Sequence, residues 1–241
     1  LSICIFSGAN AQTSIDLAGT GNKVTIPYNL DVNNGFTLEY KMYMHSLQNY
    51  NAGITQGCSN VGNPLDVYVN SSGNMTVYYG NCSATGGSES GFNAAQWYHI
   101  AHTYNPSSNS GKLYVDGVLR KTFNGIPTLT APSQPLTIGD RADGVTNSNS
   151  KFDNVRAWTG VRTATEILIN KDLCLTGSET GLELLFQMEG GSGLTLTDLA
   201  STNGTQNGTI VGGATWSVGA TCTTSCVSPA AITLPSTPTL N

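Results

Sequence analysis

Apolar and polar residues alternate in several stretches of the chain, and this alternation predicts strands that are buried on one side. It is most regular in residues 65–70 and 74–79. Successive side chains of a strand point to opposite faces of a sheet, so each stretch has an apolar and a polar side. The apolar sides comprise Leu65, Val67, Val69, Met75, Val77 and Tyr79. We therefore expect both stretches to pack one face against a core and to expose the other.

A strand that leads directly into a short helix is predicted within residues 152–171. Strict alternation places on one side Phe152, Asn154, Arg156 and Trp158, and on the other Asp153, Val155 and Ala157. Thr163 and Glu166 then have the T-x-x-E spacing of a capping box, in which each side chain bonds a backbone N–H that the first helical turn leaves free. One helix is therefore expected near residues 164–171.

A β-hairpin is the third local prediction. Residues 97–104 form one strand, and residues 112–119 contain two further strands that meet at Asp116-Gly117. An Asp-Gly pair accepts the positive φ angles of a tight type I′ turn. The chain also contains 28 Gly, and its strand stretches are separated by Asn, Ser, Thr and Gly. These residues favour turns, so we expect an all-β domain.

Composition limits the organisation and the partners of the protein. The 241 residues, 39% of them hydrophobic, suffice for a single domain with a sizeable core. The net charge is −5, and the ten Lys and Arg residues are scattered. The sequence contains no basic stripe for phosphates, so we expect no nucleic-acid partner. It also contains no apolar run that approaches the roughly 20 residues of a membrane span, so we expect no membrane insertion.

The two ends of the sequence predict export. Residues 1–11 contain an apolar run followed by Ala9-Asn10-Ala11, the form of a signal-peptide cleavage site. We interpret residues 1–11 as the end of a truncated signal peptide; an edge strand at residues 3–6 is the alternative. Residues 227–241 are rich in Pro, Ser and Thr and are interpreted as a linker to further domains. The domain would then span residues 12–226 of a secreted or cell-surface protein.

Five segments together resemble a known family. They are WYHIAHTYN (97–105), GKLYVDGVL (111–119), PLTIGDRADG (135–144), KFDNVRAWTGVRTATEI (151–167) and ETGLELLFQMEGGSG (179–193). In this order they resemble the LamG-like jelly roll of secreted bacterial proteins, within the concanavalin A-like, laminin G and pentraxin group. The resemblance covers residues 13–222 and implies a two-sheet antiparallel β-sandwich. The ends of the chain are similar to those of multidomain surface proteins of the Bacteroidota. The resemblance is less specific for function, because one sandwich architecture hosts many unrelated sites.

Six cysteines suit an oxidising compartment. One lies in the predicted leader, and Cys58 and Cys82 lie near the ends of consecutive predicted strands, where a disulfide between them is plausible. The resemblance implies a second disulfide, Cys174–Cys222, that ties down the C-terminal strand. Sequence alone does not fix connectivity, so Cys226 is either left over or replaces Cys222. A zinc site is disfavoured because Cys222-x-x-x-Cys226 has no second close pair.

The sequence contains no recognisable catalytic constellation, and we expect no enzyme activity. The jelly-roll glucanases that the chain resembles carry an E-x-D-x-x-E strand, because glycoside hydrolysis needs two facing carboxyl groups. That strand is missing here, and Glu179, Glu183 and Glu189 are interpreted as polar positions around one strand. His99 and His102 are three apart on a predicted strand and point to opposite faces, so they cannot chelate one metal ion.

Calcium is the cofactor that the sequence predicts. Asp140 and Asp143 lie on a loop that leaves a strand and resembles the calcium loop of pentraxins, and oxygen ligands on such a loop suit Ca²⁺. Arg141 stands where an acidic residue is expected, so an Asp-Gly turn with an Asp–Arg pair is the alternative. Many concanavalin A-like domains hold a second cation between an early acidic residue and one in the late strand, which implies Asp16 and Asp153. Capping of local backbone N–H groups is the alternative for Asp153.

A carbohydrate surface is predicted on the polar sides of residues 65–70 and 74–79. These sides carry Asp66, Tyr68, Asn70, Asn74, Thr76 and Tyr78, and the preceding loop offers Tyr50 and Asn51. A sugar needs a flat apolar face on which to stack and short polar groups for its hydroxyls. An ordinary water-facing sheet surface of this composition would look similar and is the alternative. The tryptophans, Trp97, Trp158 and Trp216, are assigned mainly to the core.

The sequence thus predicts an extracellular binding module that recognises a glycan or a protein ligand, supported by calcium, within a larger adhesin-like protein. An accessory module of a glycoside hydrolase and a structural spacer are the alternatives. Exposure of both Tyr68 and Tyr78 would distinguish a binding module from a spacer, because a spacer does not require an exposed aromatic pair.

Overall fold

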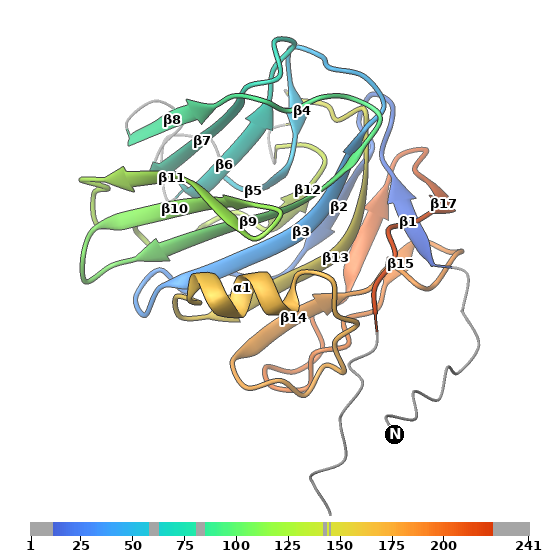
Figure 1. Cartoon of the computed structure of the whole chain (residues 1–241). Helices are drawn as coiled ribbons and strands as arrows, with labels where there is room; N and C mark the ends of the chain where they lie inside the picture. Colours follow the sequence, from blue (N-terminus) through green and yellow to red (C-terminus); the bar gives the residue numbers. More distant parts are fainter. Residues whose placement is uncertain (1–11, 58–62, 81–84, 142–143, 145, 224–241) are drawn as a thin grey trace, which may run out of the picture.

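Two antiparallel β-sheets pack face to face and form the body of the protein (Figure 1). The structure is a computed structural model and describes residues 12–57, 63–80, 85–141, 144 and 146–223. The predicted leader 1–11 and linker 227–241 lie outside these residues, as do Cys58, Cys82, Asp143 and Cys226. No helix in the described part of the chain is long and apolar enough to cross a membrane.

The first sheet, sheet A, contains eight strands within the described residues. They are β1 (Thr13–Asp16), β3 (Phe36–Met44), β9 (Trp97–Asn105), β10 (Ser110–Val115), β11 (Val118–Asn124), β13 (Ser150–Thr159), β14 (Leu182–Phe186) and β17 (Thr215–Val218). Their order is β11-β10-β9-β3-β13-β1-β17, and β14 pairs with the second half of β13.

The second sheet, sheet B, contains nine strands within the described residues. They are β2 (Lys23–Ile26), β4 (Asn51–Ala52), β5 (Ile54–Gln56), β6 (Asn63–Val69), β7 (Met75–Gly80), β8 (Thr85–Glu89), β12 (Leu136–Ile138), β15 (Thr195–Leu196) and β16 (Gly208–Val211). Their order is β15-β16-β2-β12-β5-β6-β7-β8, and β4 pairs with β6. The two sheets confirm the predicted antiparallel sandwich.

The core lies between the two sheets and contains the side chains that alternation assigned to it. The six apolar residues predicted on β6 and β7 are all fully buried there. Tyr79, the last of them, keeps its hydroxyl satisfied by donating to the carbonyl oxygen of Thr103 at 3.0 Å. The alternation on these two strands is therefore confirmed, and it leaves their polar sides on the outer face of sheet B.

The alternation predicted for residues 152–158 is wrong beyond Asp153. Asn154 has a φ of 48°, and the pairing of β13 with β3 shifts register between Asp153 and Arg156. Such a β-bulge inserts one residue and reverses the faces of the side chains that follow. As a result Val155 joins Phe152 in the core between the sheets, and Trp158 lies in a separate cluster.

The predicted hairpin turn is confirmed. It joins β10 to β11 at Asp116 and Gly117, whose φ angles are 51° and 80°. The positive angles are those of a type I′ turn, which matches the twist of the flanking strands. The Asp116 carboxylate also accepts a hydrogen bond from the backbone N–H of His99 at 2.9 Å, which fixes the turn to β9.

The predicted helix is α1 (Ala164–Asn170), and its capping box is present. The Thr163 hydroxyl accepts from the backbone N–H of Glu166 at 3.2 Å, and the Glu166 carboxylate accepts from the backbone N–H of Thr163 at 2.7 Å. We expect Thr163→Ala to lower the free energy of unfolding by about 1 kcal/mol, because an N–H of the first turn loses its acceptor. Urea denaturation measures the loss. Thr163→Ser keeps the hydroxyl and is the control; an equal loss in both variants would contradict the assigned role.

The Cys174–Cys222 disulfide, which the family resemblance implied, is present in the structure. It joins the segment after α1 to the segment after β17. The side chain of Gln12 accepts from the backbone N–H of Cys222 at 2.9 Å and donates to its carbonyl oxygen at 3.4 Å. Both ends of the described chain are therefore fixed at one place on sheet A.

Candidate functional site

Three tyrosine rings lie next to one another on the outer face of sheet B, and we call them the tyrosine face. Tyr68 projects from β6, Tyr78 from β7, and Tyr50 from the loop before β4. The ring centroids are 5.0 Å apart for Tyr50 and Tyr68 and 6.4 Å apart for Tyr68 and Tyr78. Tyr68 lies opposite Thr76 in the β6–β7 register, so the two strand tyrosines are diagonal neighbours. The structure thus brings together the three aromatic residues that the sequence proposed.

An open hollow of about 310 Å³ adjoins two of these rings. It is lined by Asn49, Tyr50, Tyr68, Asn70 and Ser71. Tyr50 is 48% exposed, so its ring is accessible from solvent. Asn49 and Ser71 were not predicted from the sequence. Their position beside Tyr50 and Asn70 in the chain is the signal that could have found them.

The rest of the sheet supports the positions of the rings. The side-chain oxygen of Asn70 accepts from the backbone N–H groups of Ser72 and Asn74 at 3.0 and 3.1 Å, so it holds the β6–β7 turn. Its amide N–H groups remain as the donors that Asn70 offers to a ligand. Gly86 on β8 lies under Tyr78, because an added Cβ there would be 2.5 Å from Cδ1 of the ring.

Asp66 lies beneath the tyrosine face, not on its surface. Its side chain projects toward the same sheet face, but the residue is only 3% exposed. Burial raises the pKa of the Tyr68 phenol, and the neighbouring Tyr78 and Asp66 raise it further. The Tyr68 hydroxyl therefore keeps its proton at neutral pH and can donate a hydrogen bond. The predicted role of Asp66 as a direct ligand residue stays a prediction.

Asp140, a predicted calcium ligand, holds the loop that follows β12. Its buried carboxylate accepts from the backbone N–H groups of Arg141 and Thr146 at 2.7 and 3.1 Å, and Lys23 lies 3.9 Å from its second oxygen. Burial raises the pKa of this carboxyl despite these partners. Asp143, the other predicted ligand on the loop, lies outside the described residues.

Asp153, predicted to pair with Asp16 around a second cation, is fully buried and caps backbone groups. It accepts from the N–H groups of Asn154 and Ala220, each at 2.7 Å. Burial, with a smaller contribution from the nearby carboxylate of Glu189, raises its pKa to about 7. Asp16 is bound by His45, whose Nε2 lies 2.9 Å from the carboxylate. Within the described residues the structure has no group of three metal-binding side chains, and calcium stays a prediction.

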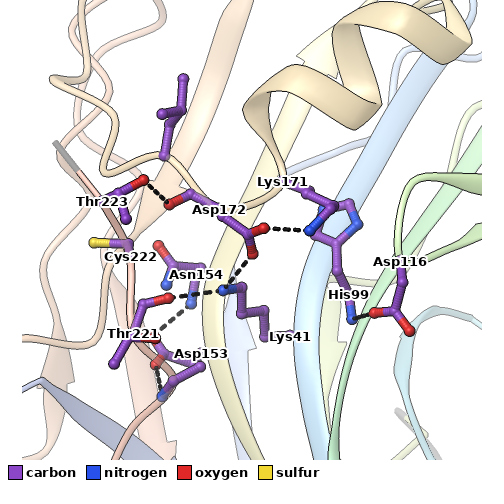
Figure 2. Close-up of polar contacts among 12 residues, drawn as sticks. Lys41, His99, Asp116, Asp153, Asn154, Lys171, Asp172, Thr221, Cys222 and Thr223 are labelled. Carbon is purple, nitrogen blue, oxygen red and sulfur yellow. Dashed lines mark hydrogen bonds and ion pairs between the residues drawn. The ribbon is translucent and has the colours of Figure 1, made fainter. Parts of the chain in front are cut away.

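A buried lysine next to Asp153 connects three distant segments (Figure 2). Lys41 lies directly opposite Asp153 in the β3–β13 register. Its ammonium group donates to Asp172 at 3.1 Å and to the carbonyl oxygen of Thr221 at 2.9 Å. These partners are 131 and 180 positions away in the sequence, so no local pattern could have predicted the cluster. It holds the segment after α1 and the C-terminal segment against sheet A.

The two histidines of β9 lie on opposite faces of the strand, as predicted. His99 contacts Glu39 at 3.0 Å on the outer side, and His102 contacts the Tyr40 hydroxyl at 3.2 Å inside the sandwich. Burial lowers the pKa of His102 to about 3, so its imidazole is neutral.

The Glu179 carboxylate accepts hydrogen bonds from two backbone N–H groups of the turn before β14. The expectation that the chain is no enzyme stays a prediction.

The assignment of the tryptophans to the core is only partly right. Trp158 is buried and its ring lies 3.8 Å from the guanidinium carbon of Arg162. Trp216 is half-buried against the core. Trp97 was placed wrongly, because it lies half-exposed on the outer face of sheet A, where its ring contacts Tyr43. Its position at the first residue of β9 leaves it near the end of the sheet.

Residues 18–168 match the profile of the concanavalin A-like lectin/glucanases superfamily. This match covers more than half of the chain, and the protein belongs to that family. Among curated proteins, no sequence matches the chain. The family includes lectins and glucanases by its description, so membership sets the fold and leaves the ligand to the site itself.

Solved structures share the fold at low sequence identity. A candidate carbohydrate-binding protein from Bacteroides ovatus is 19% identical with a TM-score of 0.67, and the match covers 87% of this chain and 60% of that protein. The heptameric SAP-like pentraxin from Limulus polyphemus is 14% identical with a TM-score of 0.62, over 90% of this chain and 99% of the pentraxin. A sialidase from Trypanosoma rangeli is 18% identical with a TM-score of 0.51, over 66% of this chain and 27% of the sialidase. These likenesses concern the fold alone.

Proposed function

We propose that this protein is an extracellular, non-catalytic module that binds a glycan through the tyrosine face. The observation that carries the proposal is the contact of Tyr50, Tyr68 and Tyr78 beside an open polar hollow. The rings offer apolar surface for the C–H face of a sugar, and the amides and hydroxyls of Asn49, Asn70 and Ser71 suit its hydroxyl groups.

Two further observations support the proposal. The superfamily to which the chain belongs includes lectins, and a structural neighbour from Bacteroides ovatus is a candidate carbohydrate-binding protein. The Cys174–Cys222 disulfide is typical of an oxidising, extracellular location. A structural spacer has no need of three neighbouring tyrosines, one of them 48% exposed, on the outer face of a sheet.

We expect Tyr68→Ala to weaken the binding of a neutral glycan by roughly tenfold, because it removes the central ring of the three. A glycan array first identifies a neutral ligand, and isothermal titration calorimetry then compares the affinities of the variants. Tyr68→Phe keeps the stacking surface and should retain most of the affinity. Val118→Ala removes an exposed apolar side chain from β11 of sheet A, away from the tyrosine face, and should leave the affinity for a neutral glycan unchanged. The absence of glycan binding, or equal losses in Tyr68→Ala and Val118→Ala, would overturn the proposal and favour a spacer.

A further inference from the structure

A second row of aromatic and charged side chains crosses the outer face of sheet A. Strand register places Trp97 of β9 opposite Tyr43 of β3, and Tyr43 opposite Lys151 of β13. Lys151 in turn lies opposite Asp16 of β1. Directly opposed residues share a face of the sheet, so the four side chains form one transverse row. Each of the four is half-exposed.

The aromatic part of the row is a platform that ends at a cation. The rings of Tyr43 and Trp97 are 5.6 Å apart and tilted by 54°. The ammonium group of Lys151 lies 5.3 Å from the centroid of Tyr43, within the range of a cation–π contact. The neighbours of Tyr43 along β3, Met42 and Met44, point into the core, which places the row on the outer side.

The two charges of the row differ in how they are compensated. The Asp16 carboxylate is bound by His45 at 2.9 Å and by the backbone N–H of Ala18 at 3.0 Å. Lys151 forms no ion pair with any residue that the structure describes. An uncompensated cation thus adjoins two aromatic rings on a protein whose net charge is −5. Charge complementarity favours an anionic ligand at this point.

We infer that this row is a second binding site, and that its ligand is a saccharide that carries a carboxylate group. The sugar ring would stack on Trp97 and Tyr43, and the carboxylate would accept a charge-assisted hydrogen bond from Lys151. The site lies on sheet A, whereas the tyrosine face lies on sheet B. It uses none of the residues of the tyrosine face and is independent of the function proposed for that face.

A pair of matched probes tests the charge of the ligand. One is a galacturonic acid tetrasaccharide, and the other is its methyl ester, which keeps the rings and linkages but lacks the negative charges. We expect the protein to bind the acid about fivefold to tenfold more tightly than the ester by calorimetry at low salt, because only the acid pairs with Lys151. Added salt should reduce this preference.

Variants then assign the site. Lys151→Met should abolish the preference for the acid, Lys151→Arg should retain it, and Trp97→Ala should weaken both probes. Lys112→Met is the control: it removes a half-exposed lysine from β10, which pairs with β9 at Thr103, six residues along the strand from Trp97. Tyr68→Ala should leave the affinity for the acid unchanged, so failure of the tyrosine face and failure of this row are distinguishable. Binding of neither probe, equal binding of both, or a preference that survives in Lys151→Met would overturn the inference.

Discussion

Replacement of both Cys174 and Cys222 by serine should lower the free energy of unfolding by about 4 kcal/mol at 25 °C, since the link closes a loop of 48 residues. The loss of the cross-link enlarges the conformational freedom of the unfolded chain, and the native contacts change little. For a domain of this size the midpoint of thermal unfolding should fall by roughly 8–16 °C. Urea denaturation and calorimetry measure the two quantities on the same protein.

A matched variant separates the covalent link from the hydrogen bonds around it. Gln12→Ala removes the hydrogen bonds of the Gln12 side chain to the backbone and the sulfur of Cys222 but leaves the disulfide intact. It should lower the free energy of unfolding by about 1–2 kcal/mol, well below the effect of the double serine variant. A double serine variant that unfolds at the same urea concentration as Gln12→Ala would show that the disulfide contributes little to stability.

Asp153 should make the protein less stable as the pH rises from about 4 to about 7 in the presence of a chelator. Burial raises its pKa from the ordinary 3.8 to about 7, so over this range the folded state holds a proton that the unfolded state has lost. The contribution of Asp153 to stability is fully present below about pH 4 and decreases as the pH rises to about 7. Above that pH the free energy of unfolding no longer changes through this group. One pKa unit corresponds to about 1.4 kcal/mol, so the total change is on the order of a few kcal/mol.

The difference in stability between the wild type and Asp153→Asn, measured by urea denaturation from pH 4 to pH 8, isolates this contribution. Asparagine leaves one of the two backbone N–H groups without an acceptor, which lowers stability by a similar amount at every pH. Asp31→Asn is the control: burial of Asp31 favours a higher pKa, but hydrogen bonds from Asn34 and Asn33 lower it overall. Its contribution to stability is therefore lost only as the pH falls toward and below about 4, and the difference for Asp31→Asn should stay nearly flat from about pH 5 to pH 8. A flat difference for Asp153→Asn would contradict the assigned burial. Added Ca²⁺ that removes the slope in the wild type would support calcium at Asp153, because the ion favours the ionised carboxylate.

Local patterns in the sequence were sufficient wherever neighbouring residues determine the structure. The buried and exposed sides of β6 and β7, the Asp116-Gly117 turn and the Thr163–Glu166 capping box each depend on residues only a few positions apart. The sequence also placed Tyr68 and Tyr78 on the polar sides of two successive strands, and the pairing of these strands as a hairpin brings the two rings together. The sequence by itself thus determined the fold class and the aromatic residues of the tyrosine face.

Only the tertiary structure decided features that depend on strand register and on contacts between distant segments. The bulge at Asn154 reversed the faces of β13, since one inserted residue changes a pattern of period two. The burial of Asp153, the contacts of Lys41 with Asp172 and Thr221, and the row from Trp97 to Asp16 each join strands that are far apart in the chain. Sequence patterns report which residues favour a strand and which of its sides is apolar. Packing of the whole sandwich decides which strands become neighbours and which polar groups are buried away from solvent.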